Sequence, residues 1–185
     1  MKQHLALRRL CEGAVLLAMA QILSLLRLYR FPDGGSIDAA MLPLVVFAVR
    51  WGPLPGLGAG FVCGILQYFT GNGLSISWIS LIGDYLLSYA TLFAAGFFRG
   101  RKNGVIYAAL VFGLARLLVH WVVGAVVWGQ YMPDTFFGLT MTGPWLYSAL
   151  YNGAYMLPCT LVTTLLAAIL NGTLKKYFSD DLKRE

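Results

Sequence analysis

The sequence predicts an all-α integral membrane protein, a single domain over residues 1–185 with six transmembrane helices. Of the 185 residues, 58% are hydrophobic, only 12% are charged, and the mean hydropathy is +0.69, which lies outside the range of ordinary soluble domains. Since a helical span needs about 20 apolar residues, a chain of this length holds about six spans and no separate soluble domain. Segments such as GAVLLAMAQILSLL are apolar on every side, whereas transmembrane β-strands alternate apolar and polar residues.

Proline, glycine and polar clusters set the boundaries of the first three predicted helices. The first is expected over about residues 10–28, because the loop segment FPDGGSID follows it. A shorter helix is expected over about residues 39–49 and ends at RWGP. The third, over about residues 56–69, is rich in glycine, which favours close helix packing in membranes, and it ends at the polar segment GNGLS.

The last three predicted helices are longer, and they are expected over about residues 76–98, 105–128 and 145–170. A short basic segment separates the first two. The longest loop, YMPDTFFGLTMTGP, precedes the last helix, and its final residue, Pro144, stands near the first helical turn, where proline is favoured.

The basic residues predict the orientation, because cytoplasmic loops carry an excess of Lys and Arg. With a cytoplasmic N-terminus, the outer segments carry only Arg27 and Arg30. The cytoplasmic segments then carry Lys2, Arg8, Arg9, Arg50, Arg99, Arg101, Lys102, Lys175, Lys176, Lys183 and Arg184. Both termini are therefore predicted to be cytoplasmic, and the loops FPDGGSID, GNGLS and YMPDTFFGLTMTGP to share the outer face. The net charge of +6 indicates topology and not nucleic-acid binding, because no basic stripe with stacking aromatics is present.

The three cysteines do not suggest a disulfide framework or a metal site. Cys11, Cys63 and Cys159 are scattered within or beside apolar segments and form no C-x-x-C pair. We expect them to be small buried hydrophobic residues.

Asp84 is the most unusual residue of the sequence, because it interrupts the apolar segment LIGDYLLSYA. An ionisable group at bilayer depth costs about 2.5–3.5 kcal/mol on insertion scales and is by default a functional candidate.

Polar and aromatic residues on two further helices could meet Asp84 and Tyr85 near the outer face. The fifth helix has His120, Gly124 and Trp128 at spacings of four, on one face, with Arg116 one turn deeper; the sixth has Tyr147, Tyr151 and Tyr155 with Asn152 beside them. Such a pocket suits a flat organic cation, because aromatic faces attract cations and a few polar groups fix orientation. The alternatives are interfacial aromatic residues, a packing role for His120, and a structural ion pair between Arg116 and Asp84.

Four stretches of the chain resemble, in order and spacing, the thiamine-specific substrate-binding (S) component of energy-coupling factor (ECF) transporters. They are GGSIDAAMLPLVVFAVRWG, DYLLSYA, RLLVHWVVGAVVW and YSALYNGAYMLP. The resemblance implies a membrane protein that binds thiamine from outside and associates with two ATPases and a transmembrane coupling protein. This chain has no P-loop motif, so ATP would be used by the partner ATPases, and no cofactor or metal is expected here.

The resemblance also implies roles for individual residues. The substrate-binding set falls on Asp84, Tyr85, His120, Gly124, Trp128, Tyr147 and Asn152. Ala14 and Ala18 form a small-xxx-small face that would dock on the coupling protein; ordinary internal packing is the alternative. The chain departs from some members of the family, which have Glu at position 84 or a tryptophan in the first outer loop.

Two other functions are compatible with a polar membrane site. An autonomous proton- or sodium-coupled carrier could use Asp84 and His120 as a relay, although no internal repeat typical of many carriers is evident. An intramembrane aspartyl protease would need a second carboxylate at depth, whereas Glu12 and Asp38 lie near helix ends on opposite sides. A serine or zinc mechanism lacks a convincing constellation, since His120 is the only histidine at depth and no H-E-x-x-H occurs.

Overall fold

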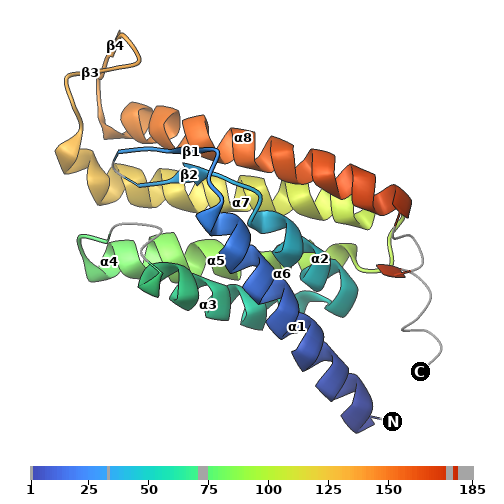
Figure 1. Cartoon of the computed structure of the whole chain (residues 1–185). Helices are drawn as coiled ribbons and strands as arrows, with labels where there is room; N and C mark the ends of the chain where they lie inside the picture. The colour runs from blue at the N-terminus through green and yellow to red at the C-terminus, as the bar shows by residue number, and fades with distance from the viewer. Residues whose placement is uncertain (1, 33, 71–74, 174–176, 179–185) are drawn as a thin grey trace.

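The computed structural model describes residues 2–32, 34–70, 75–173 and 177–178, and it is a bundle of helices with two small hairpins (Figure 1). The main helices are α1 (Lys2–Leu25), α2 (Met41–Trp51), α3 (Pro53–Phe69), a segmented helix over Trp78–Phe98, α7 (Gly104–Val126) and α8 (Pro144–Thr173). The predicted helical fold is confirmed. The predicted basic residues Lys175, Lys176, Lys183 and Arg184, and most of GNGLS, lie outside the described residues.

Three of these helices are long and apolar enough to cross a membrane: the segmented helix, α7 and α8. The helices α2 and α3 are apolar but shorter. The observed bounds lie within a few residues of those expected, except that α1 begins at Lys2 and not near residue 10. The number of spans and the cytoplasmic placement of the termini stay predictions.

The segmented helix differs from the continuous α-helix that the sequence predicts. It consists of α4 (Trp78–Ser80), the π-helix η1 (Leu81–Leu87), α5 (Ser88–Ala90), α6 (Leu92–Ala95) and the 3₁₀ turn η2 (Gly96–Phe98). Asp84 lies in the middle of η1. Short π segments inside helices are frequent at functional sites.

The glycines of α3 allow it to approach the segmented helix closely, as the sequence predicts. A Cβ atom added to Gly60 would lie 2.9 Å from the carbonyl carbon of Tyr89, and one added to Gly64 would lie 3.0 Å from that of Tyr85. Both distances are too short for ordinary side-chain contact. Glycine therefore permits backbone-to-backbone packing at these two turns.

The helices α7 and α8 lie side by side along most of their length (Figure 1). Their contact also depends on glycine: a Cβ atom on Gly113 would overlap the side chain of Thr160, and one on Gly124 would lie 2.7 Å from Nδ2 of Asn152. The half of this contact that contains Gly124 and Asn152 forms one wall of the site described below.

Both predicted loops beside the bundle contain a short antiparallel hairpin that the sequence analysis missed. In the first, β1 (Tyr29–Arg30) pairs with β2 (Ser36–Ile37); in the second, β3 (Thr135–Phe136) pairs with β4 (Leu139–Thr140). Figure 1 shows the β3–β4 hairpin projecting from the bundle beyond α8, whereas β2 contacts α8.

Arg50 is not simply a topology signal, because its side chain is fully buried. It forms a two-pronged ion pair with Glu12 of α1 and donates to the backbone oxygen of Tyr177. The indole N–H of Trp51 and the hydroxyl of Tyr177 also donate to the Glu12 carboxylate, at 2.9 and 3.1 Å. We call Glu12, Arg50, Trp51 and Tyr177 the Glu12 cluster; it joins α1, α2 and the segment after α8.

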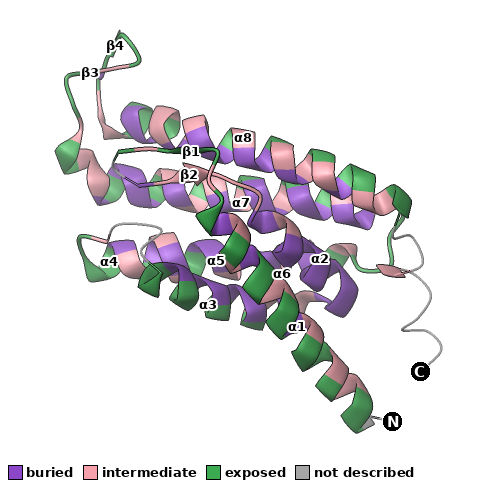
Figure 2. Cartoon of the chain, viewed as in Figure 1, coloured by how far each residue is buried: buried purple, intermediate pink, exposed green. Residues whose placement is uncertain are grey.

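The outer face of α1 is exposed along its length (Figure 2). Ala14 and Ala18 lie on this face, so internal packing, the alternative for these two residues, is wrong. Cys11 is also exposed there, against the prediction that all three cysteines are buried; Cys63 and Cys159 are buried as expected.

Candidate functional site

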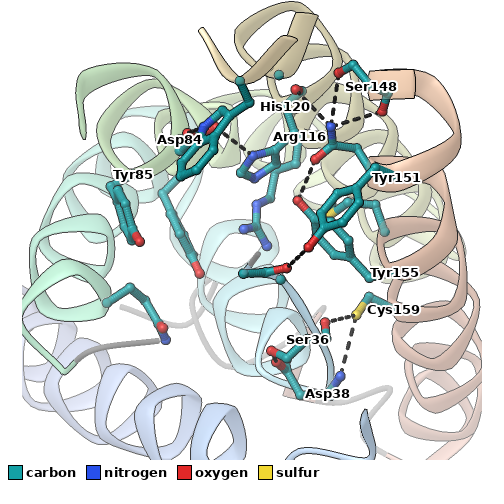
Figure 3. Close-up of a pocket in the computed structure, with 18 of the residues that line it drawn as sticks. Ser36, Asp38, Asp84, Tyr85, Arg116, His120, Ser148, Tyr151, Tyr155 and Cys159 are labelled. Atoms are coloured by element: carbon teal, nitrogen blue, oxygen red, sulfur yellow. Dashed lines mark hydrogen bonds and ion pairs between the residues drawn. The ribbon is translucent and has the colours of Figure 1, made fainter. Parts of the chain in front are cut away.

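A cavity of about 380 Å³ lies between the first hairpin, the segmented helix, α7 and α8 (Figure 3). This volume falls within the range of small-molecule sites, about 300–1,000 Å³. The seven residues singled out in the sequence, Asp84, Tyr85, His120, Gly124, Trp128, Tyr147 and Asn152, all line it. Arg116, Tyr151 and Tyr155 line it too, so the cavity extends beyond these seven residues.

Asp84 is held by donors from three positions. Its Oδ2 atom accepts from the hydroxyl of Ser80 at 2.9 Å and from the indole N–H of Trp128 at 3.1 Å, while Oδ1 lies 3.0 Å from Nδ1 of His120. A carboxylate can accept about four hydrogen bonds. Among the described residues, the protein therefore supplies three and leaves room at Oδ1 for one further donor.

His120 is the centre of a hydrogen-bonded series that runs from Asp84 to Arg116. Its Nε2 atom lies 2.9 Å from Oγ of Ser88, and Nε of Arg116 donates to the same Oγ at 3.1 Å. The Arg116 guanidinium also lies over the ring of Tyr89, 4.1 Å from its centroid. The ion pair between Arg116 and Asp84 that the sequence left open is therefore wrong: Arg116 reaches Asp84 only through Ser88 and His120.

The order Ser88–His120–Asp84 matches the arrangement of a nucleophilic triad, which the sequence analysis did not find. Ser88, however, is 0% exposed and does not line the cavity. Its oxygen also accepts a hydrogen bond from Arg116. The buried Ser88 therefore does not present a nucleophile to a ligand in the cavity.

Aromatic rings form the opposite wall of the cavity. Tyr147 and Tyr151 have ring centroids 5.7 Å apart, and Tyr151 and Tyr155 6.2 Å apart. Phe31 of the first hairpin lies 5.7 Å from Tyr151, and Phe136 of the second lies 5.4 Å from Tyr147. Both hairpins thus pack an aromatic ring against the tyrosine wall, although Phe31 and Phe136 do not themselves line the cavity.

The first hairpin is fastened to this wall at its turn. The hydroxyl of Tyr151 donates to the backbone oxygen of Gly34 at 2.8 Å. Gly35 has a φ of +83°, and a Cβ atom on it would lie 2.7 Å from the ring of Tyr155. A residue with a side chain would therefore be strained here and would collide with the cavity wall.

Asn152 is engaged within the protein, and it joins α7 to α8. Its Nδ2 atom donates to the backbone oxygens of His120 at 3.2 Å and Ser148 at 3.0 Å. Its Oδ1 atom accepts from the hydroxyl of Tyr155 at 2.7 Å. The amide thus orders His120 and the tyrosine wall, in addition to facing the cavity.

The cavity lining contains a second carboxylate, which the sequence did not single out as a site residue. Asp38 follows the first hairpin and accepts from Oγ of Ser36 at 2.7 Å and from the backbone N–H of Ala40 at 2.9 Å. Its backbone N–H and the oxygen of Ser36 both contact the sulfur of Cys159. The one available signal was its place beside the glycine pair of FPDGGSID.

The charges of the lining residues favour a cationic ligand. The described lining contains two carboxylates, Asp38 and Asp84, and one guanidinium, Arg116. No group of His, Cys, Asp and Glu suited to a metal ion occurs among the described residues.

The chain is similar over most of its length to thiamine transporters. A family model described as "Thiamine transporter protein" matches residues 10–179. The thiamine transporter ThiT of Bacillus subtilis (strain 168) is 29% identical over 196 residues, covering 98% of this chain and 99% of that protein. ThiT of Lacticaseibacillus paracasei is 27% identical over 186 residues, covering 92% and 90%.

A solved structure of ThiT from Listeria monocytogenes has the same fold. The TM-score is 0.81 at 27% identity, over 94% of this chain and 98% of that one. Together with the apolar helices, these similarities make the chain a multi-pass protein of the cell membrane and a transporter, not an enzyme. Because the family model covers almost the entire sequence, the chain belongs to the thiamine transporter family.

Proposed function

We propose that this chain is a thiamine-binding S component that captures thiamine from the outer face of the membrane. Thiamine joins a permanently positive thiazolium ring to a flat aminopyrimidine. The observation that carries the proposal is the cavity itself, whose described lining combines two carboxylates with one guanidinium, an aromatic wall and room for one more donor at Asp84. A ligand amino group would supply that donor, and the tyrosine and tryptophan faces would attract the cation.

Within this proposal, the bundle spans the membrane six times, with both termini in the cytoplasm. The basic residues Arg99, Arg101 and Lys102 support this orientation, because they follow the end of the segmented helix that is distant from Asp84. The cavity and the hairpins then face outward, where they meet free thiamine.

The energy for uptake would come from a separate ECF module of two ATPases and a transmembrane coupling protein. The exposed small face of Ala14 and Ala18 supports docking on such a partner, since small residues allow close helix approach in membranes. ATP would be hydrolysed by the partner.

Calorimetric titration of the purified chain with thiamine tests the binding role. We expect saturable binding without ATP, no binding of riboflavin or biotin, and weaker binding in Asp84→Ala and Trp128→Ala. Trp78→Ala is the matched control, because Trp78 is 79% exposed and outside the cavity lining. A folded protein that binds no thiamine would refute the proposal.

An autonomous ion-coupled carrier is the second candidate, favoured by the 3.0 Å contact between Asp84 and His120. Liposomes that contain only this chain separate the two functions. The S-component proposal expects no thiamine accumulation under a proton or sodium gradient, and accumulation only when the ECF module and ATP are added. Gradient-driven accumulation by the chain alone would support the carrier instead.

A further inference from the structure

Ser88 and Arg116 form a layer behind His120 that none of the functional assignments above includes. Both side chains are buried: Ser88 is 0% and Arg116 9% exposed. Ser88 stands one turn after Asp84 on the segmented helix, and Arg116 stands one turn before His120 on α7. Their contacts decide which nitrogen of His120 carries a proton.

Arg116 determines the first hydrogen bond of the series. A guanidinium has donors only, so its Nε–H donates to Oγ of Ser88 at 3.1 Å. One lone pair of the serine oxygen is then occupied. The single hydroxyl proton of Ser88 remains available for Nε2 of His120, 2.9 Å away.

Asp84 determines the other end of the series. Its Oδ2 atom already accepts from Ser80 and from Trp128, whose indole N–H can only donate. An ionised Asp84 can only accept, so the group 3.0 Å from its Oδ1 atom, Nδ1 of His120, then carries the proton of this contact. A bare Nδ1 would place two acceptors face to face.

We propose that Ser88 and Arg116 are positioning residues that hold His120 as a neutral imidazole with its proton on Nδ1. In this state each donor of the series has an acceptor. The alternative, an imidazolium with a second proton on Nε2, would place another cation beside the Arg116 guanidinium, with only the Ser88 oxygen between them.

The consequence for the site is the state of Asp84, and this step rests on the proposed function. With a neutral His120, the Asp84 carboxylate keeps its charge for the ligand cation. Because Nδ1–H occupies one position on Oδ1, a single acceptor position remains there. This acceptor position can bind a donating amino group on the ligand, whereas it would repel an accepting oxo group. The series therefore sets the preference for thiamine over oxythiamine, its 4-oxo analogue.

Nitrogen NMR of the ligand-free protein tests the state of His120 directly. The sequence contains two histidines, so ¹⁵N-histidine labelling of a His4→Gln variant leaves His120 alone. At neutral pH we expect one protonated nitrogen, Nδ1, and one bare nitrogen, Nε2. A proton on Nε2 would overturn the proposal, whether or not the protein binds thiamine.

Binding measurements test the role of the layer. We expect Ser88→Ala to weaken thiamine binding about tenfold, as for loss of one buried hydrogen bond, and to reduce the ratio of thiamine to oxythiamine affinity by a similar factor. Ser88→Thr keeps the hydroxyl and should restore both values. Thr163→Val is the control. The Thr163 hydroxyl is buried, has no hydrogen-bond partner among the described residues, and lies outside the cavity lining.

The outcomes of the binding experiment separate this proposal from the proposed function. An unchanged affinity ratio in Ser88→Ala, or a Ser88→Thr variant no better than Ser88→Ala, would contradict the positioning role while leaving thiamine binding intact. Absence of thiamine binding in the unmodified protein would instead refute the proposed function, and the nitrogen spectrum would still decide the state of His120.

Discussion

The Glu12 cluster predicts a large loss of stability when its carboxylate is removed. Arg50 has a side chain that is 0% exposed, and Glu12 is its ion-pair partner. In Glu12→Ala the buried guanidinium loses the counter-charge of Glu12, and the donors of Trp51 and Tyr177 lose their common acceptor.

The size of the effect follows from the burial of Arg50. Breaking a buried ion pair by removing one partner costs about 3–5 kcal/mol. For a chain of 150–250 residues, each kcal/mol lowers Tm by about 2–4 °C, so we expect Glu12→Ala to lower Tm by about 6–20 °C. Replacing both partners with apolar residues, as in Glu12→Leu with Arg50→Met, should recover much of this loss.

Thermal unfolding of the detergent-solubilised protein measures these shifts. Arg9→Ala on the same helix removes an exposed charge and should change the free energy of unfolding by less than about 0.5 kcal/mol. Thiamine affinity at a temperature where the variant is folded should be unchanged, because the cluster lies outside the cavity lining. A Tm within 2 °C of the unmodified protein for Glu12→Ala, roughly the effect of a surface substitution, would refute the reasoning.

Three further substitutions test packing and the hairpin. Gly60→Ala should destabilise the fold by about 1–3 kcal/mol, because the added methyl group overlaps the segmented helix. Gly58 faces open space, so Gly58→Ala should leave Tm unchanged. Equal Tm values for the two variants would contradict the close approach of α3 to the segmented helix. Gly124→Ala should lower thiamine affinity about tenfold by displacing α8 side chains, as calorimetry would measure. Tyr151→Phe keeps the ring but loses the hydrogen bond to the backbone oxygen of Gly34. Stopped-flow fluorescence should therefore show thiamine dissociating about fivefold faster, the kinetic equivalent of about 1 kcal/mol. An unchanged dissociation rate would exclude the idea that Tyr151 tethers the first hairpin over the site.

The helical fold was predictable because hydrophobicity and its interruptions encode it directly. Long apolar runs and the boundaries at proline and glycine placed each helix within a few residues, apart from the start of α1, which lies at Lys2 and not near residue 10. The π-helix around Asp84 was not predictable, since widening a helix by one residue has no signature in residue type. Arg50 was misread for a related reason: its burial depends on Glu12 and Tyr177, which are distant in sequence.

The site was predictable to the extent that chemistry marks single residues. Asp84 and His120 stand out in apolar helices, and Gly124 follows His120 by one turn of α7. Trp128 lies beyond the end of α7, in a 3₁₀ turn over Trp128–Tyr131, where α-helical spacing does not apply. Ser88 does not stand out, because serine is common in membrane helices and only the fold brings it to His120. Asp38 was missed because a carboxylate near a helix end is usually solvated, and only the fold of the first hairpin brings it into the cavity lining.

These contacts explain how a carboxylate can stay at depth in an apolar helix. The cost of Asp84 is offset by donors from Ser80, Trp128 and His120, and His120 is in turn fixed by Ser88. Because these groups are ordered by one another, little conformational entropy remains to be lost on binding. What the protein does not supply is the compensating charge, since the carboxylates of the described lining outnumber its guanidinium. Under the proposed function, a cationic ligand would supply that charge, so the same residue that is costly in the membrane would become a source of selectivity.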